Sequence, residues 1–120
     1  MNKAFILLFQ LLLTFGLGKL HAQILQPAKW QTSLQPEKPS VGTEATLVGS
    51  VLIDKDWYVY GSDFNPELGP IVTSVNLNEN STGVALIGPL KSIDASTKYD
   101  DIWGGDISYF KMAGRFEQTI

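Results

Sequence analysis

The sequence predicts an all-β protein, a sandwich or a barrel, and three features of the chain indicate this. Glycine and proline recur at short intervals, as in residues 37–42, 65–70 and 104–105, and leave pieces too short for typical helices. Within the pieces, apolar and polar residues alternate with the period of two typical of a half-buried strand. The pieces are also rich in β-branched and aromatic residues. A chain of 120 residues with this pattern is expected to form one domain.

Six or seven segments after residue 23 have this strand pattern. In the second of them Leu47, Val51 and Ile53 share an apolar face, and in the first Trp30 lies on such a face. We therefore expect these four side chains to be largely buried. Residues 78–83 are expected to form a hairpin loop between the fourth and fifth strands. The expected strands are residues 30–34, 45–53, 57–60, 71–77, 84–90, 107–110 and 113–120.

The N-terminal 22 residues have the organisation of a secretory signal peptide. A short basic start at residues 1–3 precedes the mainly apolar residues 4–18, and the small residue Ala22 follows at a cleavage position. An uncleaved membrane anchor is the alternative, but about 20 apolar residues are needed to span a bilayer and this run is shorter. We expect export with cleavage after Ala22, which leaves residues 23–120 as the mature domain.

Removal of the signal peptide limits the chemistry available to the chain. Without Lys3, Lys19 and His21 the mature domain has seven basic and twelve acidic residues, a net charge of −5, and neither histidine nor cysteine. This excludes Ser-His-Asp and Cys-His catalysis, imidazole or thiolate zinc sites, and disulfide chemistry carried by this chain alone. Nucleic acid is not an expected partner, because no basic patch is present. We predict no catalytic residue, no metal site and no cofactor.

The acidic residues Asp100, Asp101 and Asp106 are the one cluster that could bind Ca²⁺ through carboxylate and carbonyl oxygens. They lack the D-x-D-x-D-G order of a calcium-binding loop. A solvated acidic loop is therefore the preferred interpretation.

The aromatic residues are more informative than the acidic ones. Tyr58 and Tyr60 are expected on one face of their strand, with Trp57 and Val59 on the other. One pair is expected in the core, while the other faces outward or lines a groove. Trp103 lies among glycines and aspartates in an expected loop, where it is either exposed or folded back over the end of the sandwich. Exposed aromatics beside acids could form a carbohydrate platform or a protein contact.

Several short motifs together carry a resemblance that covers nearly all of the mature chain. They are Pro-Ala-Lys-Trp at 27–30, Val-Gly-Thr-Glu at 41–44, Asp-Trp-Tyr-Val-Tyr-Gly at 56–61, Gly-Pro at 69–70, Tyr-Asp-Asp-Ile-Trp-Gly-Gly at 99–105 and Phe-Glu-Gln at 116–118. No single motif is decisive, since each is short. As an ordered set they resemble the N-terminal periplasmic domain of DsbD-type thiol:disulfide interchange proteins, a family of protein-disulfide reductases.

The resemblance implies an immunoglobulin-like antiparallel β-sandwich in the periplasm. The family domain receives electrons from thioredoxin-like and membrane domains of the same protein and passes them to oxidised periplasmic proteins through a cysteine pair. A cap loop shields the cysteines until a partner docks, and such a lid gives selectivity because an exposed disulfide exchanges with any thiolate that reaches it.

The resemblance also assigns site residues in this sequence. Tyr58 and Tyr60 match the aromatic positions that line the active-site groove. We expect Ile102 and Trp103 to lie over this groove with few backbone bonds to hold them there, and the glycines of the cap loop to give it freedom to move. The cap loop corresponds to Asp100, Asp101, Ile102, Trp103 and Gly104.

The absence of cysteine is the main departure from the family. The family's cysteine pair normally lies one or two strands beyond the position of Ile120, and Phe116, Gln118 and Ile120 are still alternating there. We expect either a domain cut before its redox strand or a cysteine-free relative; an ordinary C-terminal edge strand is the alternative for the alternation. In either case the 120 residues cannot exchange disulfides by themselves.

A second function from another class also fits the sequence. The chain could be a small secreted β-sandwich binding module for carbohydrate or protein. Its stacking surface would consist of Trp57, Tyr58, Tyr60 and Trp103.

Overall fold

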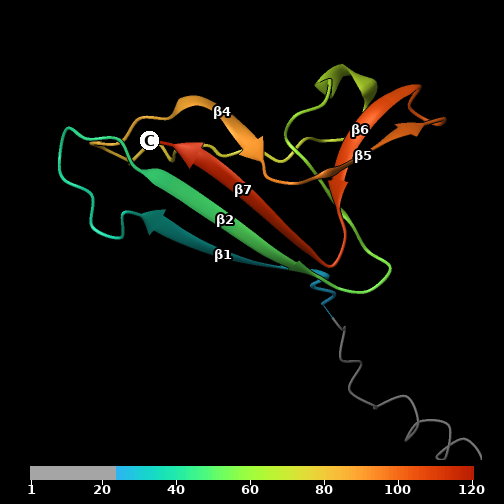
Figure 1. Ribbon diagram of the computed structural model, residues 1–120, viewed down its shortest axis with the longest axis horizontal. Helices are drawn as coiled ribbons and strands as arrows, with labels where there is room; N and C mark the ends of the chain where they lie inside the picture. The colour runs from blue at the N-terminus through green and yellow to red at the C-terminus, as the bar shows by residue number, and fades with distance from the viewer. Residues whose placement is uncertain (1–23) are drawn as a thin grey trace, which may run out of the picture.

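The computed structural model describes residues 24–120, which form two antiparallel sheets (Figure 1). The four-stranded sheet has the order β1 (Ala28–Gln35), β2 (Thr46–Ile53), β7 (Ala113–Thr119), β4 (Ile87–Ser92), and the three-stranded sheet has the order β3 (Val59–Tyr60), β6 (Gly105–Phe110), β5 (Ser96–Asp100). The 3₁₀ turn η1 (Pro66–Leu68) is the only helical element of these residues. The predicted all-β sandwich is thereby confirmed.

The expected signal peptide, residues 1–22, lies outside the described residues. Within residues 24–120, no helix has the length and apolar character that a membrane crossing requires.

The two sheets meet near the end of the larger sheet where β2 ends and β7 begins (Figure 1). Val51 and Ile53 from β2, Phe110 from β6 and Phe116 from β7 form the buried cluster there. The rings of Phe110 and Phe116 lie edge to face, with centroids 5.1 Å apart, an arrangement that aromatic quadrupoles favour. This contact is the main apolar link between the sheets.

The predicted inner face of β2 is confirmed at Val51 and Ile53, which are 1 % and 5 % exposed. Leu47 is only half-buried, and Trp30 is 49 % exposed, so the expected burial of Trp30 is wrong. Trp30 lies on the edge strand β1. One side of its ring packs against Phe116, with centroids 5.7 Å apart, and among residues 24–120 no strand beyond β1 covers the other side.

Residues 71–77 form an irregular connection rather than the expected strand, and residues 78–83 are consequently not a hairpin loop. Thr73 ties the connection to β3: its N–H donates to the Gly61 carbonyl at 3.0 Å and its Oγ1 to the Tyr60 carbonyl at 2.6 Å. Because β3 has only two residues, it offers too few partners for a regular ladder. The connection instead encloses a cavity of about 190 Å³ against the large sheet, lined mainly by Trp30, Leu47, Val75, Leu90 and Phe116.

The strand β4 begins at Ile87 instead of residue 84, and its register against β7 shifts between Ile87 and Lys91. Gln118 of β7, 2 % exposed, fills the irregularity with its side-chain amide. Its Nε2 donates to the carbonyls of Ile87 at 3.3 Å, Gly88 at 3.1 Å and Thr119 at 3.1 Å. A buried polar side chain is thus hydrogen-bonded, as burial requires.

The strand β5 was not expected from the sequence. Four of its five residues are exposed, so the alternation that indicates a half-buried strand is missing. Its five pairs with β6 nevertheless run without a register shift, from Ser96 opposite Tyr109 to Asp100 opposite Gly105. Asp100 therefore ends a strand, whereas the sequence analysis placed it in a loop.

We predict that Val51→Asp abolishes cooperative folding, because a carboxylate would have no partner among the rings of the core cluster. Small domains have only about 5–15 kcal/mol of stability to lose. Thermal unfolding followed by circular dichroism measures the effect. Leu52→Asp is the matched control, since Leu52 is 65 % exposed on the opposite face of β2. Equal melting behaviour of the two variants would contradict the assignment of faces.

Candidate functional site

Four aromatic rings gather on the face of the three-stranded sheet that points away from the core; we call them the aromatic cluster. Val59 pairs with Phe110 and packs in the core, so the alternate pair Tyr60 and Tyr109 faces the other way. Trp57 remains 49 % exposed, so only Val59 of the expected Trp57–Val59 pair joins the core. The aromatic cluster consists of Tyr58, Tyr60, Phe64 and Tyr109.

The two predicted groove residues are in direct contact. The rings of Tyr58 and Tyr60 lie edge to face at 83°, with centroids 5.2 Å apart, and their hydroxyls share a hydrogen bond of 3.2 Å. Tyr58 also meets Tyr109 at 6.3 Å, and Tyr60 meets Phe64 at 5.9 Å between centroids. The cluster thus joins β3 to β6 and to the residues before η1.

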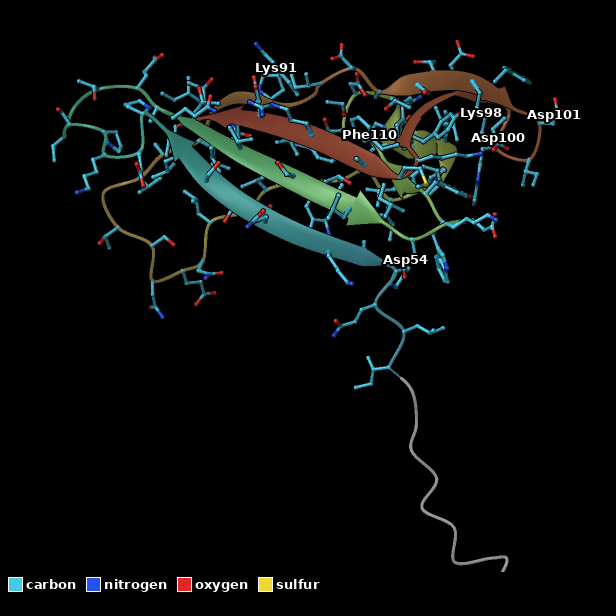
Figure 2. The ribbon with its side chains drawn as sticks, turned by 60° about the horizontal axis from the view of Figure 1, so that its bottom comes forward. Asp54, Lys91, Lys98, Asp100, Asp101 and Phe110 are labelled. Carbon is cyan, nitrogen blue, oxygen red and sulfur yellow. The ribbon has the colours of Figure 1, made fainter. Side chains whose placement is uncertain are left out.

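Lys98 covers part of the aromatic cluster. Its Nζ lies 5.1 Å from the ring centroid of Tyr109 and 5.8 Å from that of Tyr58, within the range of a cation–π interaction. Figure 2 shows Lys98 at the same end of the molecule as Asp100 and Asp101. The ring faces of two tyrosines are therefore partly occupied by a positive charge.

Hydrogen bonds of the residues directly after Tyr60, which we call the polar clasp, fix the short strand β3. The buried Ser108 of β6 donates its hydroxyl to Asp63. Ser62 donates its N–H to Ser92 Oγ of β4 and its hydroxyl to the Leu90 carbonyl, each at 2.8 Å. Because Ser92 and Ser108 belong to different sheets, the polar clasp holds the chain after Tyr60 to both.

The cap loop is a hydrogen-bonded hairpin turn between β5 and β6. Asp100 Oδ1 accepts the N–H of Ile102 at 2.9 Å and of Trp103 at 3.2 Å, and Gly104 donates its N–H to the Asp100 carbonyl at 2.7 Å. Gly104 has a φ of 72°, which favours glycine. These hydrogen bonds lie within the turn itself, which the Asp100 side chain organises.

Trp103 folds back from the cap loop onto the chain after η1. A Cβ added at Gly69 would collide with the Trp103 ring, and Gly69 has a φ of 129°. The neighbouring Gly105 packs closely against Leu68 in the same way. Trp103 is still 41 % exposed, whereas Ile102 is 87 % exposed. Of the two apolar residues of the cap loop, only Trp103 is held against the body of the protein.

The neighbours of Tyr60 change the pKa of its hydroxyl. Its pKa is raised above the usual 10.0, first by the hydrogen bond with Tyr58, next by burial and then by the charge of Tyr58. The indole of Trp103 lowers the pKa by a smaller amount, and the charge of Asp100 raises it.

Sequence reasoning did not single out Phe64, Lys98 or Tyr109 as members of the site. Tyr109 was within reach, because it alternates with the core residue Phe110 in a predicted strand. Lys98 gave no signal, since its strand was not predicted. No group of three or more potential metal-ligating His, Cys, Asp or Glu residues occurs in residues 24–120.

Comparison with protein families, curated proteins and solved structures gives no match for this chain.

We predict that Gly69→Ala displaces Trp103 from its packing position, because the added Cβ occupies the space of the indole ring. The measurement is tryptophan fluorescence, whose change should vanish in a Trp103→Phe background. Gly83→Ala is the matched control: Gly83 also has a positive φ, 74°, but open space around its Cα. Identical spectra for Gly69→Ala and the wild type would contradict this packing.

We predict that Tyr60 deprotonates above pH 10 and that Tyr58→Phe moves its pKa back toward 10.0, since the bond with Tyr58 is the largest cause of the shift. The folded state holds this proton more tightly than the unfolded chain does. Its contribution to stability is therefore complete below pH 10 and is lost as the pH rises through the raised pKa. Absorbance titration of tyrosinate measures both proteins, and an unchanged Tyr60 pKa in Tyr58→Phe would contradict the assigned cause.

Proposed function

We propose that this chain supplies the scaffold, groove and cap loop of a DsbD-type thiol:disulfide interchange domain that is exported to the periplasm. Its partners in this proposal are thioredoxin-like and membrane domains of a DsbD-type protein and oxidised periplasmic proteins. The observation that supports it is the contact between the strand that leads into the cap loop and a groove tyrosine: Nζ of Lys98 in β5 lies 5.8 Å from the ring centroid of Tyr58. The resemblance assigns the cap loop and the tyrosines to one site, and a shared site requires this proximity.

The redox step itself needs a cysteine pair that these 120 residues do not contain. In the proposed exchange, a dithiol supplied by another segment or chain is oxidised to a disulfide. The client disulfide is reduced to two thiols, and two electrons and two protons pass between them. This chain contributes the surface on which the partners dock and the cap loop over it, and it is inactive by itself.

The binding-module alternative is supported by exposure alone: Trp57, Tyr58 and Trp103 are each 41–49 % exposed. A sugar-stacking platform needs open, similarly oriented ring faces. Here Tyr58 and Tyr60 are perpendicular within a few degrees, and Lys98 lies over Tyr58. The geometry therefore favours a protein contact over a carbohydrate contact.

We predict that the chain binds a reduced thioredoxin-like domain of a DsbD-type protein, and that Tyr58→Ala in the aromatic cluster weakens binding at least about tenfold, equivalent to about 1.4 kcal/mol, because Tyr58 is 45 % exposed and available to a partner. Isothermal titration calorimetry measures the affinities. Trp57→Ala is the control, because Trp57 is similarly exposed but lies outside the aromatic cluster. Binding of oligosaccharides together with no binding of the thioredoxin-like domain would select the alternative function.

The codons that follow Ile120 in the source genome provide a second test. A continuing frame with a cysteine pair within a few strands, and hydrophobic spans after it, would support the interchange function. A stop codon would favour the binding module.

A further inference from the structure

Three of the four strand edges in residues 24–120 carry features that prevent pairing with another strand. The edge of β4 is interrupted by its register shift and by Pro89. The edge strand β5 is short and contains Lys98 and Asp100. The two-residue strand β3 receives hydrogen bonds from Thr73 on its outer side. These edges are unsuited to strand addition.

Of these protective features, the outer edge of β1 has only a single lysine, Lys29. All eight of its residues pair with β2 without a register shift, from Ala28 opposite Ile53 to Gln35 opposite Thr46. The strand contains no glycine or proline, and Lys29 is its one charged residue. Alternate N–H and C=O groups along such a strand point away from β2, and no other strand of residues 24–120 pairs with them.

The side chains at this edge are also incompletely covered. Trp30 and Leu34 lie on the inner face, opposite Val51 and Leu47 of β2. Trp30 is 49 % exposed and Leu34 is half-buried. An additional strand beyond β1 would cover apolar surface as well as satisfy backbone hydrogen bonds.

We propose that β1 pairs antiparallel with β1 of a second copy of this chain, which joins the two four-stranded sheets into one sheet. The pairing places Thr32 opposite Thr32 of the second copy at the twofold axis. Trp30 then lies opposite Leu34 of the second copy, and Lys29 opposite Gln35. A second copy fits because the strand is complementary to itself in this register: apolar residues meet on one face and no like charges face each other.

The register follows from symmetry and side-chain direction. A twofold axis perpendicular to the sheet keeps inner face with inner face, so opposed residues must be both odd or both even in number. Centring the axis on Gln31 would place Trp30 opposite Thr32 and Leu34 opposite Ala28, so neither large apolar side chain would face the other. Centring it on Thr32 places Trp30 and Leu34 opposite each other. The absence of acidic residues from β1 also limits repulsion between chains of net negative charge.

The test is sedimentation velocity of the full chain from about 1 µM to about 1 mM, a range that covers weak specific association. We expect the wild type to shift toward dimer with concentration. Thr32→Lys and Thr32→Glu should each remain monomeric, because like charges meet at the axis. An equimolar mixture of the two should restore a dimer, since opposite charges then face each other.

Ser50→Lys is the matched control, as Ser50 is exposed in β2 away from the edge and should dimerise like the wild type. Unchanged thermal unfolding verifies that each variant is folded. A wild type that stays monomeric throughout, or Thr32 variants that dimerise as it does, would overturn the proposal. A monomeric wild type that binds a foreign strand peptide at β1 would equally overturn it, because the occupant would then be another protein.

Discussion

The packing of Phe110 on Phe116 is the contact on which the rest of the molecule depends. It joins β6 of the small sheet to β7 of the large one, with Val51 and Ile53 completing the cluster. Beside this cluster, the large sheet is covered by the irregular connection of residues 71–77, which leaves a cavity lined by Leu47, Val75 and Leu90.

The contact between Phe110 and Phe116 also determines where the aromatic cluster lies. Val59 packs into the core beside Phe110, and the alternation along β3 then directs Tyr60 to the opposite face. A strand of two residues makes too few ladder hydrogen bonds to fix this segment by itself. The polar clasp adds hydrogen bonds to both sheets, since Ser62 is bonded to Ser92 of one sheet and Asp63 to Ser108 of the other. The tyrosine pair is therefore positioned by the apolar packing of Val59 and by the hydrogen bonds of the polar clasp.

The sequence was sufficient for the fold class and for the inner face at Val51 and Ile53, because strict alternation reports burial where a second layer lies above the strand. It failed at Trp30, since alternation gives the face of a strand but not whether the strand is at an edge. The prediction of a strand at residues 71–77 was wrong because the neighbouring strand β3 has only two residues, too few to pair with a full strand. The contact of Trp103 with Gly69 depends on tertiary packing, which no local pattern contains.

That contact also constrains how a cap loop of this construction could open. The bonds from Asp100 to Ile102, Trp103 and Gly104 lie within the turn itself, so they can persist whatever the turn does relative to the body. The Trp103 ring, in contrast, is held across to Gly69, and separation from it breaks only apolar packing. The cap loop would therefore open by movement of the intact β5–β6 turn, in which the Trp103 ring separates from Gly69. The hydrogen bonds within the turn would not have to break. That movement would leave the hydrogen bond between Tyr58 and Tyr60 intact, because neither tyrosine belongs to the turn.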